Sequence, residues 1–357
     1  MIQRTLTLFI LVMSAIRIPG CKEAAPVEVN LDPLARQALY DTTSSYYTDF
    51  SKYPKNIADL PIGIFGLGTG TADMLETALA LDSYDNITGE AGSDRIRDFA
   101  GENFICYTAL SDADNIYDAS GKLDVHDAAI KHTLFLVGDK CAEGVKERAK
   151  IILAAGNITR GTGLDDIRQM LDVSNSGVKI ISVAEEGVKS LLDELADKPM
   201  LNYSVGMLAD SLAIASGAYP QMMKDISAER GLGSVAPMVC QRMDAVDSVS
   251  AADIRKAFAA MVESHYTAGK PSPICALITD IDLDQEAREA IQDEINTYRS
   301  KRIGGDYPYR AFINDRLIFI NPLKCAAEEC YRVLRADNNL ALRIGGEKVF
   351  HYTDLPM

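Results

Sequence analysis

Polar side chains follow several short apolar runs of this 357-residue chain, and their types suit acid–base chemistry. Asp112 comes after the run 103–107, and Asp280 and Asp282 come after the run 274–279. Two carboxylates that face one ligand can act as general acid and general base. Carboxylates in loops are more often only solvated, so both interpretations stay open.

A glycine-rich turn, Gly66-Leu-Gly-Thr-Gly70, separates an apolar run from a helical pattern. Glycines let backbone N–H groups approach a ligand closely, so such a turn can bind an anion. The spacing GxGxG is not the GxGxxG of dinucleotide sites, and it is not a P-loop, because no Gly-Lys-Ser/Thr follows. The turn is therefore a candidate contact for a small anion.

The stretch 150–171 shows which elements position such groups. A short apolar run ends at Gly156-Asn157, and apolar residues then recur with helical spacing from Leu164 to Leu171. In open α/β sheets, the turn between a buried strand and a helix is where ligands bind. A strand–helix connection without any ligand is an equal alternative.

Apolar runs alternate with helical patterns along the whole chain, which predicts an α/β fold of parallel sheets with helices on both faces. The expected strands are 60–65, 103–107, 150–157, 178–183, 204–209, 274–279 and 316–320. The expected helices are 34–46, 74–79, 124–150, 164–171, 185–192, 220–229, 254–264, 284–298 and 323–334.

The composition is that of a globular protein, with 47% hydrophobic and 24% charged residues. The net charge of −15 argues against a nucleic-acid partner, because phosphate binding needs a basic surface. Six cysteines beyond Cys21 show no readable disulfide pattern, and no Cys/His spacing suits a metal. The four histidines are scattered, so we expect no metal site.

The first 21 residues predict an export signal. A positive start is followed by an apolar region at 6–16, too short to span a bilayer comfortably. Ile18-Pro-Gly-Cys21 resembles the lipobox of bacterial lipoproteins, in which Cys21 would be lipidated. We expect an exported, membrane-anchored lipoprotein, periplasmic or at the cell surface. An ordinary cleaved signal and a cytoplasmic chain are the alternatives.

Four segments together resemble the Asp/Glu racemase superfamily, and glutamate racemases in particular. Residues 61–70 resemble P-I-G-[VI]-F-D-S-G-x-G-G, and residues 151–158 resemble I-[VI]-[IV]-A-C-N-T. Residues 180–189 are similar to V-I-G-V-V-E-P-G-V-K. Residues 208–220 are similar to L-A-T-x-G-T-[IV]-x-S-G-A-Y-P, whose last five letters are intact here.

The resemblance implies two pseudo-symmetric parallel-sheet domains with the site in the cleft between them, and no cofactor. In that family one cysteine thiolate removes the α-proton of an amino acid, and a second cysteine returns one. Gly156 stands at the first cysteine position. The second motif, C-T-H, falls at Ile278-Thr-Asp280, where only Thr279 matches. Cys275, three residues before Ile278 on a strand, should point to the opposite face, as a core thiol.

Neither Gly156 nor Ile278 can carry a proton, so the two-thiol route is lost while polar groups that could bind a ligand remain. Asp280, with Asp112 or Tyr117, is the candidate substitute pair for the lost bases. The candidate ligand-binding residues implied by the resemblance are Gly66, Leu67, Tyr117, Asn157, Ile158, Glu185, Ser216, Thr279 and Asp280.

The expected organisation is a signal at 1–21, a tether and helix at 22–54, one α/β domain at 55–172 plus 284–357, and a second at 173–283. Three functions stay open. The chain is a degenerate racemase relative that binds a small amino acid, a dicarboxylate or a cell-wall fragment. Alternatively, it is an active cofactor-independent racemase or isomerase that uses groups other than cysteine. The third is a structural or interaction lipoprotein whose cleft is vestigial and whose segment 316–357 forms the working surface.

The expected location bears on these three functions. Glutamate racemases supply D-glutamate for peptidoglycan precursors in the cytoplasm, and an exported lipoprotein would lie away from that pathway. The sequence does not fix the oligomeric state, and a homodimer stays open.

Overall fold

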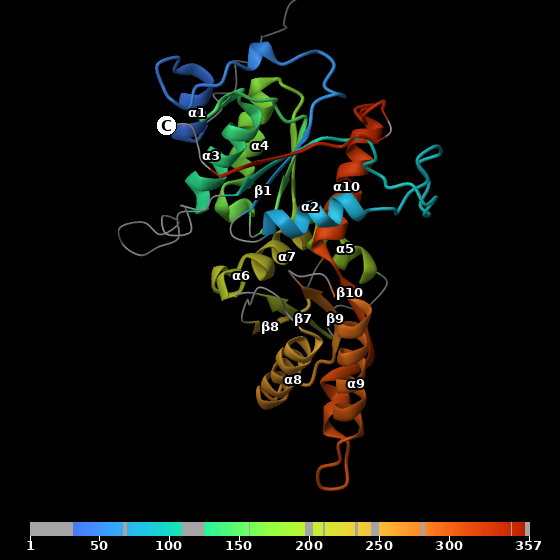
Figure 1. Ribbon diagram of the computed structural model, residues 1–357. Helices are drawn as coiled ribbons and strands as arrows, with labels where there is room; N and C mark the ends of the chain where they lie inside the picture. Colours follow the sequence, from blue (N-terminus) through green and yellow to red (C-terminus); the bar gives the residue numbers. More distant parts are fainter. Residues whose placement is uncertain are drawn as a thin grey trace, which may run out of the picture. The chain divides into compact units, whose positions relative to one another are not determined.

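The fold is α/β, with parallel sheets covered by helices, as the alternating pattern predicts (Figure 1). The computed structural model describes residues 31–66, 70–108, 125–156, 158–196, 203–209, 211–232, 235–243, 250–279, 283–343 and 345–353. Two parallel sheets form the framework of residues 31–357. No helix of the described residues is long and apolar enough to cross a membrane.

The five-stranded sheet has the order β11-β2-β1-β5-β6, and all its neighbouring strands pair in parallel. Its strands are β1 (Ile62–Gly66), β2 (Phe104–Thr108), β5 (Ile151–Ala154), β6 (Lys179–Ser182) and β11 (Val349–Tyr352). Phe65 pairs with Ala154, which pairs with Ser182, so the carboxyl ends of β1, β5 and β6 lie at one edge. Ligand-binding turns of parallel sheets collect at that edge.

Strands β1, β2 and β5 of this sheet are buried on both faces, which explains why they read as continuous apolar runs. On β1, Ile62 and Ile64 pack on one side and Phe65 packs on the other. The first side is covered by α2 (Gly70–Ala80) and α10 (Pro322–Ala336). The second side is covered by α1 (Pro33–Tyr40), α3 (Val125–Val137) and α4 (Leu164–Ser174).

The four-stranded sheet has the order β10-β9-β7-β8 and is also parallel. Its strands are β7 (Ser204–Ala209), β8 (Met238–Arg242), β9 (Ile274–Thr279) and β10 (Ile313–Ile320). One face packs on α5 (Val183–Glu194), α6 (Ser211–Ser216) and α7 (Ala218–Glu229). The other packs on α8 (Ala251–Thr267) and α9 (Gln285–Ser300).

Two helices connect the sheets. Helix α5 follows β6 directly and leads toward β7, whereas α10 follows β10 and leads back to β11, and the two helices pack together. Strand β6 therefore belongs to the first sheet, although the expected division put 173–283 in the second domain. Likewise, β10 belongs to the second sheet, although 284–357 was expected in the first. The domain boundaries themselves stay a prediction.

Most expected elements match, and the differences occur where the pattern is short or interrupted. The helix expected over 124–150 ends at Val137, and a small hairpin of β3 (Lys140–Cys141) and β4 (Gly144–Val145) follows. There the buried ammonium of Lys146 donates to the Gly138 carbonyl at 2.7 Å, which fixes the turn after the helix. The edge strands β8 and β11 were missed, because half-buried edges have no continuous apolar run.

Candidate functional site

Gly66, at the end of β1, and Gly70, at the start of α2, lie beside the end of β5 at the carboxyl edge of the five-stranded sheet. A Cβ atom added to Gly66 would lie 2.9 Å from the Thr71 hydroxyl and 3.2 Å from the Ala155 Cβ. A Cβ atom added to Gly70 would lie 3.5 Å from the Gly156 backbone nitrogen. A side chain at position 66 would force its neighbours to shift, whereas a Cβ at position 70 would make an ordinary van der Waals contact. Both glycines lie beside Ala155, and Gly70 also lies beside Gly156.

Gly156 itself has a φ of +79°, in the left-handed region that side chains other than glycine rarely adopt. This is the position that the resemblance aligns with the family's first cysteine. The backbone there is set for glycine, so a cysteine at this position would be strained.

The other aligned position is part of the core. Ile278 is 1% exposed and packs between the second sheet and α5, and Thr279 is buried beside it. Cys275 is a buried thiol of the same cluster, so the expectation that it faces the opposite side is wrong. The reason is a register shift, in which Ser204 pairs with Ile274 and the next residue, Val205, pairs with Ala276.

Ile158, a candidate ligand contact, is fully buried in the core of the first sheet. Its carbonyl accepts a 2.5 Å hydrogen bond from the Ser182 hydroxyl. Ser182 also caps α5, since its hydroxyl oxygen accepts from the Glu185 backbone N–H. This pair of bonds ties the turn after β5 to the start of the helix that leads to the second sheet.

Glu185 is the centre of a charge cluster beside this turn. Its carboxylate is almost fully buried, yet it lies 2.5 Å from an Arg168 nitrogen and 3.3 Å from Lys189 Nζ. Burial raises the pKa of Glu185, but Arg168 and Lys189 outweigh burial and bring it below its usual value. Glu185 is therefore ionised near neutral pH and holds cations in place instead of donating a proton.

Arg160 links the turn after β5 to helix α7. Its guanidinium pairs with both carboxylate oxygens of Glu229 at the end of α7, one of them at 3.1 Å. It also lies 3.8 Å from Glu185. The pKa of Glu229 is lowered by its hydrogen bond with Arg160, so this carboxylate is charged.

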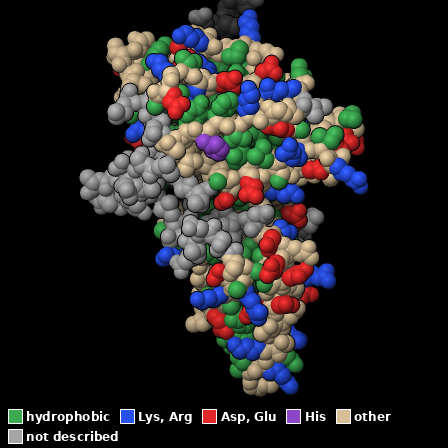
Figure 2. Space-filling model, viewed as in Figure 1, with side chains coloured by type: hydrophobic (Ala, Val, Ile, Leu, Met, Phe, Trp, Pro, Cys, Tyr) green, Lys and Arg blue, Asp and Glu red, His purple; other side chains and the backbone are tan. Residues whose placement is uncertain are grey.

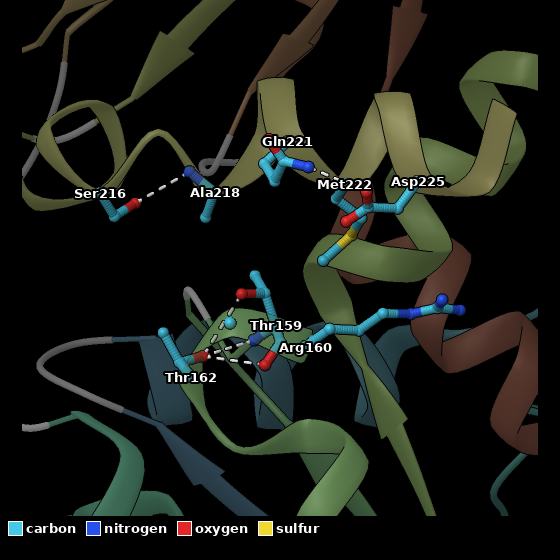
Figure 3. Close-up of a pocket in the computed structure, with 9 residues that line it drawn as sticks. Thr159, Arg160, Thr162, Ser216, Ala218, Gln221, Met222 and Asp225 are labelled. Carbon is cyan, nitrogen blue, oxygen red and sulfur yellow. Dashed lines mark hydrogen bonds between the residues drawn. The ribbon is translucent and has the colours of Figure 1, made fainter. Parts of the chain in front are cut away.

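Between the turn after β5 and helices α6 and α7 lies a hollow of about 130 Å³, which we call the polar hollow. It is lined by Thr159, Arg160, Gly161, Thr162, Ser216, Ala218, Gln221, Met222 and Asp225. Figure 3 shows Ser216, Gln221, Met222 and Asp225 on the α6–α7 side and Thr159 and Thr162 opposite them. Cavities of roughly 150 Å³ hold a molecule the size of benzene, so the polar hollow suits a small ligand.

The polar groups of the hollow are held in place by their neighbours. The Thr162 hydroxyl accepts from the Thr159 N–H at 2.7 Å and donates to the Thr159 carbonyl at 3.1 Å. The Ser216 hydroxyl donates to the Ala213 carbonyl, and Gln221 Nε2 donates to one oxygen of Asp225 at 2.9 Å. Asp225 is the one carboxylate among the described lining residues, so the hollow has no acid–base pair there.

Of the predicted ligand-binding residues, Ser216 lines the hollow, Gly66 lies at the neighbouring sheet edge, and Glu185 lies in the charge cluster. Cys21, Leu67, Asp112, Tyr117, Asn157, Asp280 and Asp282 lie outside the described residues. Sequence reasoning pointed to the turn that holds Thr159 and Thr162 without naming these residues as contacts, and it missed Gln221 and Asp225. A usable signal was present, because these residues directly follow the segments 151–158 and 216–220.

The described part of the chain has no group of three or more His, Cys, Asp or Glu residues that could hold a metal. Its six cysteines are free thiols, and Cys106, Cys275 and Cys330 are buried. Burial raises the pKa of Cys106 to about 12, so this thiol is not a ready nucleophile.

Solved structures of glutamate racemases are similar to this one, although no family model and no curated protein sequence matches the chain. The enzyme of Francisella tularensis in complex with D-glutamate is 16% identical, with a TM-score of 0.49 over 84% of this chain and 90% of that chain. The enzyme of Thermus thermophilus in complex with beta-chloro-D-alanine is 16% identical, with a TM-score of 0.48 over 82% and 87%. Isoform RacE1 of Bacillus anthracis is 12% identical, with a TM-score of 0.45 over 82% and 88%. Likeness at this level assigns neither activity nor ligand to this chain.

Proposed function

We propose that this protein binds a small amino acid in the polar hollow and does not racemise it. The observation that carries this proposal is the composition of the hollow. It combines hydroxyls, one carboxylate and the buried side chain of Met222 in a space that suits only a small molecule. The resemblance to amino-acid racemases supports the ligand class.

The distribution of charge favours a zwitterion over a dicarboxylate. Asp225 keeps one carboxylate oxygen for an ammonium group, since Gln221 occupies only the other. The nearest cation, Arg160, pairs with Glu229 and lies 3.8 Å from Glu185, so its charge is already balanced by nearby carboxylates. The first turn of α7, at Ala218, adds the positive end of a helix dipole, where a single carboxylate would be favoured.

Loss of the proton carriers supports a binding role without turnover. Inversion at the α-carbon by the two-thiol route needs a base on each face of the substrate. By the resemblance, those positions are Gly156, with no side chain, and Ile278, with an alkyl side chain in the core. Asp112 and Asp280 stay candidate substitutes, and proton exchange tests them directly.

Export as a lipoprotein anchored at Cys21 belongs to the same proposal. A binding protein outside the cytoplasm would not need to serve precursor synthesis. We therefore expect the ligand to be an amino acid, or a fragment that carries a free amino acid end.

The test has two readouts on the same protein. Shifts of the melting temperature and isothermal titration calorimetry would measure the binding of L- and D-amino acids. The same measurements on matched dicarboxylates that lack the amine would serve as the comparison. NMR in D2O would follow deuterium at the α-carbon. We expect saturable binding of an amino acid, at least tenfold weaker binding of its deaminated analogue, and no exchange above a control without protein.

Asp225→Asn should weaken the amino acid at least tenfold and leave the deaminated analogue unchanged. Asp293→Asn, on the exposed side of α9, is the matched control and should change neither. Deuterium incorporation would contradict the proposal and favour an active isomerase. Absence of binding to any compound would favour a structural or interaction role.

A further inference from the structure

The loop between α9 and β10 carries a group of exposed cations beside exposed apolar side chains. We call Lys301, Arg302, Ile303, Tyr307 and Arg310 the basic tip. They lie at the amino-terminal edge of the four-stranded sheet, near the start of β10 (Figure 1). The polar hollow lies after the carboxyl ends of β5 and β7, so the tip is a separate feature.

The basic tip is a preformed structure. Ile303 and Asp306 pair across the turn Gly304-Gly305, with N–H to carbonyl distances of 2.9 and 3.1 Å in the two directions. Below the turn, the buried ring of Tyr309 stacks on Tyr266 with 4.4 Å between ring centres. A ligand would therefore meet a shaped surface without first ordering the loop.

The charge of the tip is opposite to that of the chain. Residues 299–310 contain four basic side chains and one acidic side chain, whereas the chain carries −15. The guanidinium carbons of Arg302 and Arg310 lie 5.4 and 4.0 Å from the centre of the Tyr307 ring. Basic and acidic groups are mixed on the rest of the visible face (Figure 2).

Two nearby cations form ion pairs with carboxylates, whereas these two arginines do not. Lys301 lies 3.3 Å from Glu263, and Arg255 lies 2.5 Å from Glu294. Arg302 and Arg310 instead donate to the backbone carbonyls of Gly305 and Arg299. In the described part of the chain neither has a carboxylate within ion-pair distance, so their charge is available to a partner.

We propose that the basic tip docks on the surface of an anionic phospholipid bilayer. Ile303 is 45% exposed and Tyr307 37% exposed, so two apolar groups project next to two unneutralised guanidinium groups. A tyrosine ring suits the headgroup region, and arginines near an anionic leaflet add electrostatic attraction. The acidic remainder of the chain is repelled by the same surface, which restricts contact to the tip.

The test is cosedimentation of residues 31–357, which contain both sheets and all the core clusters, with phospholipid vesicles. We expect binding to vesicles with about 30% anionic lipid, weakening as salt rises from about 0.05 to 0.5 M, and little binding to zwitterionic vesicles. The double variant R302Q/R310Q should lose about fivefold per arginine, so about 25-fold in all. I303S/Y307S should weaken binding while the salt dependence persists.

K55Q/K140Q removes the same charge from two exposed lysines outside the tip, in the loop before β1 and in the β3–β4 hairpin, and should bind within about twofold of wild type. Circular dichroism melting would show that all variants fold alike. Any one of three results would overturn the proposal. These are equal binding to anionic and zwitterionic vesicles, no binding by the wild type, and unchanged binding by R302Q/R310Q. The proposal would also be overturned if soluble polyphosphate bound the protein as tightly as vesicles do, with the same dependence on the two arginines. That result would favour an acidic polymer as the partner.

Discussion

The ends of β5 and β9 stand at the two positions that the resemblance aligns with cysteines, and their surroundings differ. After β5, the chain has a left-handed glycine, a Ser182 hydroxyl on the Ile158 carbonyl, and the buried Glu185 cluster. At the end of β9, Ile278 packs among apolar side chains of α5 and β7. The chain after β5 makes polar contacts, and the end of β9 is part of the apolar core.

The two ends therefore differ in how an added side chain would be received. Ile278 lies in a strand interior whose neighbours close around an aliphatic side chain. The turn after β5 tolerates fewer substitutions, because its backbone conformation and its link to α5 position the polar hollow. The following predictions test whether the two ends differ in this way.

The largest effect is expected at the apolar end. Ile278→Ala should lower the free energy of unfolding by about 3 kcal/mol, because it leaves a cavity under α5. Urea denaturation would measure it. Ile87→Ala, at an isoleucine that is 88% exposed, should change stability by about 0.5 kcal/mol or less. A loss below about 1 kcal/mol at Ile278 would mean that β9 ends in an open cleft.

The sequence predicted the framework well because buried parallel strands are continuous apolar runs, as β1, β5 and β7 are. Gly66 and Gly156 were singled out separately, and they lie at one edge because parallel strands share a carboxyl edge. The sequence could not reveal the register shift at Cys275, which depends on pairing with β7. Asp225 was also missed, because its role depends on how α7 lies against the turn at Thr159.

A smaller loss is expected at the polar end. Arg168→Met should cost about 2 kcal/mol at neutral pH, because the carboxylate of Glu185, 3% exposed, loses its nearest cation. Arg230→Met is the matched control, since Arg230 is about as exposed but pairs with Asp193, which is 70% exposed. That control should cost less than about 1 kcal/mol.

The pH dependence of the Arg168 effect has a definite sign. The pKa of Glu185 is below its usual value in the folded state, since Arg168 and Lys189 outweigh the opposing effect of burial. Its contribution is therefore complete above the ordinary glutamate pKa and is lost as pH falls through the folded-state value. The difference between wild type and Arg168→Met should shrink in acid. A difference that stays constant with pH would assign the loss to packing of the arginine stem.

The smallest effect is expected at Gly156. Gly156→Ala should cost about 1 kcal/mol because φ is +79°, and urea denaturation would measure it. Gly177, with a φ of +76° and open space around its Cβ position, is the matched control. An equal loss at both glycines would show that backbone conformation alone disfavours a side chain at position 156.

Thiols placed at both aligned positions would then still lack a properly held base after β5, so G156C/I278C should give no deuterium exchange. Exchange by that double variant would show that the two ends differ only in their side chains and that the racemase geometry is intact.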